Sequence, residues 1–210
     1  MADNYLENKY ENLIKNKTSM GTKKATAVSS LMLKNRSYRG YDQRCVVTLE
    51  HLKHIVSVND KIPSARNQQV LRFKLIDSDN ADKVLNLIKL GSALPDLHLP
   101  IKGTEPRAFI IICSIIDADK WTYTDLGISC QSMLLQAVEM GLNGICIGAF
   151  NKEKIKDEFN LEAEPLLILA IGKGAEKIRI KSIEADKDHK YYRENGEHIV
   201  PKVKINELIL

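Results

Sequence analysis

Apolar and polar positions along the chain follow patterns that alternate between helix spacing and strand spacing. Residues 48–56 place apolar side chains on one face behind Thr48 as N-cap, which predicts a helix. Residues 70–77, VLRFKLID, alternate apolar and polar and predict a half-exposed strand. Residues 108–115, AFIIICSI, have no polar face, as is typical of a strand in a sheet covered on both sides.

The second half of the chain continues this alternation. The strongest helix pattern runs from about Asp125 to Met140, with Gly141 as its C-terminal cap. Residues 145–150 read as a short strand that ends in a glycine turn, residues 151–159 as a short helix, and residues 165–172 as a second buried strand. A short helix capped by Asp79 or Asn80 is expected before the loop at residues 94–106, and the last forty residues are expected to be loop-rich. Together these elements indicate layered helices around a central sheet.

Residues 1–33 differ from the rest and are treated as an N-terminal helical arm, with residues 34–210 as the folded domain. The arm has one amphipathic helix pattern between Tyr5 and Ile14, followed by a loop or a weak helix. Because so short a helix cannot bury enough surface alone, we expect it to pack against another surface.

Composition and charge narrow the class of protein. The hydrophobic fraction is 44%, and 31 basic against 27 acidic residues leave a net charge of only +4. That excess, with 6% aromatic residues and no basic stripe, argues against a nucleic-acid partner. There is no apolar run of membrane-spanning length and no leader pattern, so no membrane partner and a cytoplasmic location are expected.

Common catalytic and metal motifs are missing from the sequence. It contains no GxSxG, HExxH, Walker A or GxGxxG pattern. His51 and His54 lie three apart on the predicted helix, but no third ligand is close in sequence, so a surface pair is preferred over a metal site. Cysteines occur at four positions without metal-type spacing and are expected to be mostly buried, reduced thiols: Cys45, Cys113, Cys130 and Cys146.

Three segments remain as candidates for binding. In KNRSYRGY, Arg36, Ser37 and Arg39 offer two guanidinium forks and a hydroxyl to a phosphate group, while a solvated charged face is the alternative. Tyr38 and Tyr41 in the same segment are expected to be packing residues.

The second segment is IPSARNQQ, which precedes a strand and offers amides and backbone N–H groups to a planar ring. The alternative is an ordinary turn. The third is GLNGICIGAF, where small residues around Gly148 permit close approach of a ligand. Its alternative is a tight strand exit.

In their order and spacing, these segments resemble the FMN-dependent nitroreductase family over residues 34–210. The resemblance implies an α+β fold with three α-β-α layers, a central mixed sheet flanked by helices, and an intertwined homodimer. FMN is then the cofactor, bound without a covalent bond at the dimer interface. We also expect the arm's helix to pack across the dimer.

Family positions carry over to this chain residue by residue. The Arg-Ser-x-Arg segment holds the flavin phosphate and ribityl chain, the Pro-Ser turn of the other subunit lines the ring, and the turn after the GLNG strand passes its reactive edge. A basic pair near the C-terminus closes on the phosphate, with a solvated tail as the alternative. The implied cofactor-binding residues are Arg36, Ser37, Arg39, Pro63, Ser64, Ala65, Asn67, Gln69, Ile147, Gly148, Ala149, Lys202 and Lys204.

The activity implied by the resemblance is ping-pong hydride transfer from NADH or NADPH to a nitroaromatic, a quinone or a similar acceptor. No catalytic side chain is assigned, and Asp125 is interpreted as a helix cap or first-turn acid. Alternatives are another reaction of the same fold, such as dehalogenation, heterocycle dehydrogenation or flavin breakdown, or flavin binding without catalysis. The sequence departs from the family at Val70 and Leu71, where Pro-Trp is common, and in the loop at residues 94–106.

Overall fold

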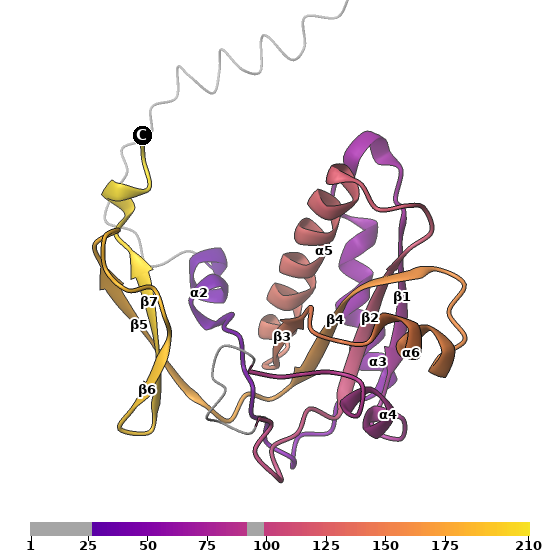
Figure 1. The fold of residues 1–210 in the computed structure, drawn as a ribbon, viewed down its shortest axis with the longest axis horizontal. Coiled ribbons are helices and arrows are strands. Elements are labelled where there is room, and N and C mark those ends of the chain that lie inside the picture. The colour runs from indigo at the N-terminus through magenta and orange to yellow at the C-terminus, as the bar shows by residue number, and fades with distance from the viewer. Residues whose placement is uncertain (1–26, 92–98) are drawn as a thin grey trace, which may run out of the picture. The chain divides into compact units, whose positions relative to one another are not determined.

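A computed structural model describes residues 27–91 and 99–210 (Figure 1). The chain divides into two compact units, Met1–Ser30 and Leu31–Leu210. The predicted helix between Tyr5 and Ile14 lies outside the described residues. The helices are α2 (Ala27–Lys34), α3 (Leu49–Val56), α4 (Ala81–Leu85), α5 (Lys120–Glu139) and α6 (Lys152–Glu158), with short 3-10 helices η1 (Ser57–Asp60), η2 (Ala65–Asn67) and η3 (Ile205–Glu207). The strands are β1 (Leu71–Ile76), β2 (Ala108–Ser114), β3 (Asn143–Ile147), β4 (Glu164–Gly172), β5 (Lys177–Ile183), β6 (Tyr192–Glu194) and β7 (Glu197–Val203).

The central sheet has four strands in the order β1-β2-β4-β3. Each neighbouring pair is antiparallel. Its parallel component is one isolated bridge beside β3, between Ser37 and Gly144. This bridge joins the predicted phosphate-binding segment directly to the central sheet.

Helices cover both faces of this sheet, so the predicted three layers are confirmed (Figure 1). Strand β2 is buried along its whole length, as its apolar sequence predicts. Alternate residues point to opposite faces: Ala108, Ile110 and Ile112 pack with α3 and α5, whereas Phe109 and Ile111 pack on the side of α4 and α6. A strand with a core on each side cannot carry polar residues, which explains its composition.

Local signals set several element boundaries as predicted. Thr48 caps α3 in a capping box in which His51 takes part, and Asn151 caps α6. At the end of α5, Gly141 has a φ of 78° and the Leu142 N–H donates to the Ala137 carbonyl at 2.8 Å.

The predicted start of α5 at Asp125 is wrong. The helix begins at Lys120, and its N-cap is Asp119, whose carboxylate accepts from the Trp121 and Thr122 N–H groups. The first turn exposes its aromatic residues, Trp121 and Tyr123, so the apolar stripe begins only at Leu126 and marks the start too late.

The prediction that the last forty residues are loop-rich is also wrong. Residues 177–203 form a second sheet in the order β5-β7-β6, with β5 parallel to β7 and β6 antiparallel to it. The sequence KIRIKSI of β5 alternates with period two, which is a strand signal that its high charge obscured.

Candidate functional site

The segment that carries Arg36 and Arg39 is fixed to the sheet by its two tyrosines. The Tyr41 side chain is 3% exposed, and its hydroxyl donates to the Tyr38 carbonyl at 3.0 Å. The Tyr38 ring lies so close to Gly174 that a Cβ there would meet it at 2.2 Å. Both tyrosines are therefore packing residues, as predicted, and they hold the backbone between the arginines in one conformation.

Glu176 is a second anchor for this segment, and no sequence motif indicated it. Its carboxylate accepts hydrogen bonds from the backbone N–H groups of Arg39 and Gly40. The same carboxylate pairs with Arg193, at the tip of the C-terminal sheet. Because Glu176 is neutralised by Arg193, its charge does not cancel that of the Arg39 side chain.

One cavity of about 420 Å³ brings four of the predicted residues together. Arg36, Ser37 and Arg39 line it from one side, and Lys202 of β7 from another. Its other lining residues are Asn35, Gln131, Leu134, Gly144, Cys146, Ile178, Tyr191, His198 and Val200.

Three buried nitrogen atoms around this cavity have no hydrogen-bond partner within the described residues. They are Nε of Arg36, Nε of Arg39 and Nδ1 of His198. The Arg39 side chain is 8% exposed and that of His198 3%. Leaving such groups unpaired costs on the order of 1–3 kcal/mol each. All three residues line the same cavity, and with Lys202 they give it a positive charge that suits an anion.

The arrangement of Arg39 is set by an aromatic neighbour. Its guanidinium lies 4.8 Å from the centre of the Tyr191 ring, and the Tyr191 and His198 rings are 5.1 Å apart. Burial, and next the positive charge of Arg39, hold the pKa of His198 below its usual range. In the free chain His198 is therefore neutral over a wider pH range than an exposed histidine.

Cys146 departs from the expected burial of the cysteines, because it is exposed while Cys113 and Cys130 are buried. Strand β3 turns Cys146 toward α5 and into the cavity. Its neighbour on α5 is Cys130, whose thiol hydrogen-bonds to it and lowers the pKa of Cys146. A thiol on the face of a sheet is exposed where a cavity, and not a packed side chain, lies against it. The apolar residues around Cys146 in the sequence do not reveal that cavity.

The turn at residues 62–69 lies at a different cavity, of about 260 Å³. Pro63, Ser64 and Gln69 line it together with Asp125 of α5. The interpretation of Asp125 as a cap or first-turn acid is wrong: it lies inside α5, is buried, and accepts a hydrogen bond from the Ala65 N–H at 2.8 Å. It therefore ties this turn to the helix.

The turn is also strained. Arg66, Asn67 and Gln69 have φ angles of 51°, 54° and 49°, in the left-handed region that non-glycine residues seldom adopt. The side chains of Asn67 and Gln69 are exposed and bond to each other at 3.1 Å. Two amide side chains are thus presented to solvent by a backbone that needs support from elsewhere.

After β3, residues 147–149 carry the third predicted group. Ile147 is buried, whereas Gly148 and Ala149 are exposed. The Ala149 carbonyl accepts from the Lys89 N–H at 2.8 Å, and a Cβ at Gly148 would meet only Leu167, at 3.9 Å. The backbone here is held in place and open to a ligand.

Lys204 is placed apart from Lys202. Its ammonium pairs with Glu184, and it lines another cavity, with Lys181 and Tyr192. Lys202 therefore shares a cavity with the two arginines, while the charge of Lys204 is already paired.

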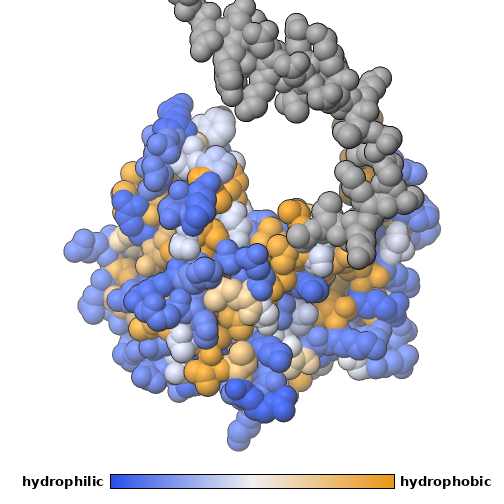
Figure 2. All heavy atoms as spheres, turned by 180° about the vertical axis from the view of Figure 1, so that it is seen from behind, coloured by the Kyte–Doolittle hydropathy of each residue, from blue (hydrophilic) through white to orange (hydrophobic). Residues whose placement is uncertain are grey.

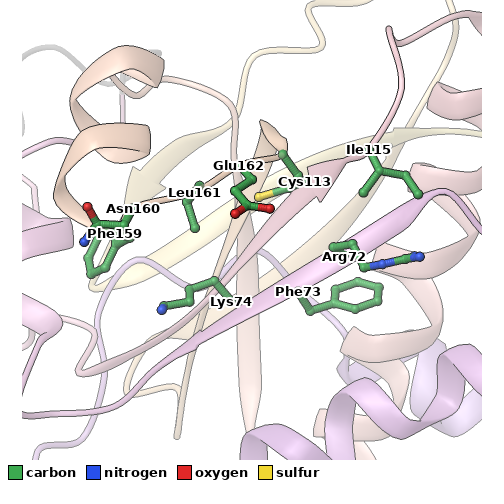
Figure 3. Close-up of a pocket in the computed structure, with 10 residues that line it drawn as sticks. Arg72, Phe73, Lys74, Cys113, Ile115, Phe159, Asn160, Leu161 and Glu162 are labelled. Atoms are coloured by element: carbon green, nitrogen blue, oxygen red, sulfur yellow. The ribbon is translucent and has the colours of Figure 1, made fainter.

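Another cavity, of about 650 Å³, holds none of the predicted residues (Figure 3). Arg72 and Lys74 of β1 line it, with Phe159 to Ala163 after α6 on the opposite side. Figure 3 shows these side chains around Cys113, whose pKa burial raises to about 11. No buried nitrogen or oxygen atom of its lining residues lacks a partner in the part of the chain that is described, so it gives a weaker binding signal than the arginine cavity.

Within residues 27–91 and 99–210, no helix has both the length and the apolar character that crossing a membrane requires. The same ranges contain no cluster of three or more metal-ligating His, Cys, Asp or Glu side chains.

The chain is similar to a known protein family and to several solved structures. The nitroreductase family model matches residues 114–173. A nitroreductase family protein from Clostridium difficile has 25% identity and a TM-score of 0.55, covering 70% of this chain and 83% of its own. A nitroreductase family protein from Streptococcus pneumoniae has 15% identity and a TM-score of 0.60, covering 71% and 92%.

A third structure is that of a variant of the FMN- and NADPH-dependent nitroreductase NfnB from a Sphingopyxis strain, with 16% identity, a TM-score of 0.57, and coverage of 71% and 88%. No curated protein matches the chain. The chain thus has the α+β nitroreductase fold, which these structures share over about 70% of its length. The resemblance to the nitroreductase family is confirmed, with the matching family segment running from the end of β2 to the end of β4.

Proposed function

We propose that this protein is an FMN-dependent oxidoreductase that passes electrons from NADH or NADPH to a small organic acceptor, such as a nitroaromatic compound or a quinone. The observation that carries the proposal is that Arg36, Arg39 and His198 line one cavity and that each has a buried nitrogen atom without a partner among the described residues. A phosphate group has the charge and the oxygen atoms to satisfy them. The family match and structural neighbours named for FMN support the same cofactor.

The residues fit the two ends of FMN separately. Arg36, Ser37, Arg39 and Lys202 would hold the phosphate and the ribityl chain in the arginine cavity. The open backbone at residues 147–149 and the turn at residues 63–69 would line the ring. We keep Lys204 as a weaker candidate, since it must first leave Glu184.

Bound FMN supplies the redox chemistry, because its ring accepts and donates hydride. The chain's own contribution is binding and electrostatics. The N–H groups of Gly148 and Ala149 would stabilise negative charge as it develops on the ring. No side chain needs to act as an acid or a base for hydride transfer, so no catalytic residue is assigned.

We further propose that the site is completed in a homodimer. The arginine cavity and the turn at residues 63–69 are separate in one chain, although both are needed to enclose one cofactor. Apolar surface is available for an interface: Figure 2 shows hydrophobic patches among hydrophilic ones. Large apolar side chains are exposed at Val46, Ile115, Ile116, Trp121, Tyr123, Ile205, Leu208, Ile209 and Leu210.

We also propose a cytoplasmic location. Support comes from the cysteines, which are free at all four positions although Cys130 and Cys146 are neighbours. Unbridged thiols are usual in reducing compartments. Reduced nicotinamide donors are available there too.

The direct test is purification of the full chain and measurement of flavin absorbance, its release on denaturation, and its bleaching by NADH or NADPH. Arg36→Ala and Arg39→Ala should each weaken FMN binding by about 1.5–3 kcal/mol, the scale of a hydrogen bond to a charged group. Arg44→Ala is the matched control, because that exposed arginine pairs with Asp42. A protein that neither carries nor binds FMN would overturn the proposal.

Mixed dimers test how the site is assembled. If the arginine cavity and the turn come from different subunits, a dimer of one Arg39→Ala chain and one Asn67→Ala chain has one site with both changes and one site with neither. FMN binding should then return at half of the sites, with the affinity of the unmodified protein. If one chain forms the whole site, every site in the mixed dimer stays impaired.

A further inference from the structure

The sequence did not indicate that His198 belongs to this site. It lies in β7 and is 3% exposed, yet its Nδ1 atom has no partner among the described residues. A buried histidine without a partner is costly, so it is rarely found unless a ligand supplies the missing contact. Arg36 and Arg39 line the same cavity, and their buried Nε atoms likewise have no partner among the described residues.

The charges around His198 define what the ligand must be. Arg39 and Arg193 are the positive groups that act on it, and Glu176 is the negative one. Glu176 is paired with Arg193, which leaves Arg39 as the uncompensated charge nearest to the ring. Arg36 and Lys202 add positive charge at the cavity wall. Such a site is complementary to a doubly negative group and repels a proton on His198 until that group arrives.

The other groups near the ring leave His198 as the one that can change charge at neutral pH. Tyr191 stacks against it, and Lys177 shares a second cavity with it. Histidine is the side-chain type whose charge ordinarily changes near neutral pH. Cys146 faces the arginine cavity as a thiol and is the one rival that needs its own control.

We propose that His198 is a ligand for a dianionic phosphate group in this cavity, and that it takes up one proton when the anion binds. The proton changes Nδ1 and Nε2 into two N–H donors, so that one of them completes the set formed by Arg36 and Arg39. Binding is thereby tuned to pH, and the site distinguishes a dianion from a neutral or singly charged group. The inference rests on the proposed function, since the phosphate group is expected to be that of FMN.

Proton uptake is measurable directly. The full chain, freed of flavin by dialysis against potassium bromide, is titrated with sodium sulfate in buffers of different ionisation enthalpy in a calorimeter. Sulfate stays doubly negative across the range, so any proton taken up on binding is taken up by the protein. We expect uptake approaching one proton per sulfate between about pH 6 and pH 7.5, a window around the ordinary histidine pKa of about 6.5. Sulfate that binds with no proton uptake would overturn the role of His198.

Variants assign the proton. His198→Asn should abolish the uptake and weaken binding of sulfate and FMN by about 10- to 150-fold, the equivalent of one hydrogen bond to a charged group. Tyr191→Phe keeps the ring that stacks on His198 and, as the control, should retain the uptake. Cys146→Ser should retain the uptake. If His198→Asn keeps the uptake, or Cys146→Ser loses it, the assignment to His198 is wrong.

Comparing FMN with riboflavin separates this inference from the proposed function. If FMN binds more tightly than riboflavin in the unmodified protein and the difference shrinks in His198→Asn, both stand. If sulfate binds with proton uptake at His198 but FMN does not bind, the anion site stands and the proposed function fails. If FMN binds and turns over equally well in His198→Asn, the function stands and this inference fails.

Discussion

Asp125 offers the sharpest test of how the turn at residues 63–69 is held. Its carboxylate is 5% exposed and accepts the Ala65 N–H at 2.8 Å. Asp125→Ala removes a charged acceptor and leaves that N–H unpaired, at an expected cost of about 1.5–3 kcal/mol. For a chain of this size, this loss lowers the melting temperature by roughly 3–12 °C.

Part of that loss should appear locally, because the turn is strained. Each of the left-handed residues Arg66, Asn67 and Gln69 costs about 1 kcal/mol. Without Asp125 the turn is expected to relax, which exposes the Ala65 amide and moves the Asn67 side chain. Asp125→Asn retains an acceptor oxygen, so its effect should be smaller, at about 0.5–1.5 kcal/mol.

The assay combines denaturant unfolding with hydrogen exchange at the Ala65 amide. Thr124→Ala is the control, since Thr124 is the preceding residue of α5 and bonds only to the Lys120 carbonyl of its own helix. Its effect should stay within about 0.5 kcal/mol. If Asp125→Ala unfolds like the control and the Ala65 amide stays protected, the link between α5 and the turn does not carry this energy.

Three further predictions concern the sheet and the cavity. Gly144→Ala should destabilise the fold by several kcal/mol in denaturant unfolding, because its Cβ would lie 2.7 Å from the Ala170 carbonyl oxygen, which is fixed backbone; a loss below 1 kcal/mol would contradict this. The pKa of His198 is lowered in the folded chain, so the unfolded chain binds that proton at higher pH. In weakly binding buffer, the free energy of unfolding should therefore fall as pH drops below about 6.5. His198→Asn should show less of that fall, and an unchanged pH profile in this variant would refute the reasoning. Cys146 should react with iodoacetamide near neutral pH, and Cys130→Ala should slow the reaction by raising the pKa of Cys146; equal rates would mean that Cys130 does not stabilise the thiolate.

The neighbouring positions of the two cysteines follow from packing that no sequence pattern records. Leu134 lies against Gly144, where an added Cβ would meet it at 2.6 Å. Cys130 lies one helical turn, about 6 Å, before Leu134 along α5. Cys146 lies two residues, about 6.6 Å, after Gly144 along β3. The helix and the strand run in opposite directions, so these equal steps bring the two thiols together.

Much of the fold was predictable because its signals are local. A strand with a core on both faces must be apolar throughout, and β2 is. Caps such as Thr48 and Gly141 act within one helical turn, so the sequence shows them directly. The start of α5 and the C-terminal sheet were missed where exposed aromatic or charged residues masked the pattern, since exposure depends on neighbours far along the chain.

By itself the sequence determined the layered order of the elements from α3 to β4 and pointed to the segment with Arg36 and Arg39. The tertiary structure alone decided that His198 joins them, that Glu176 holds their backbone, and that Asp125 supports a turn rather than capping a helix. The physical reason is the distance along the chain over which the interactions act, because helix and strand patterns reflect interactions between residues only a few positions apart. The cost of a buried, unpaired nitrogen depends on which distant segments close over it, and only the folded chain brings those segments together.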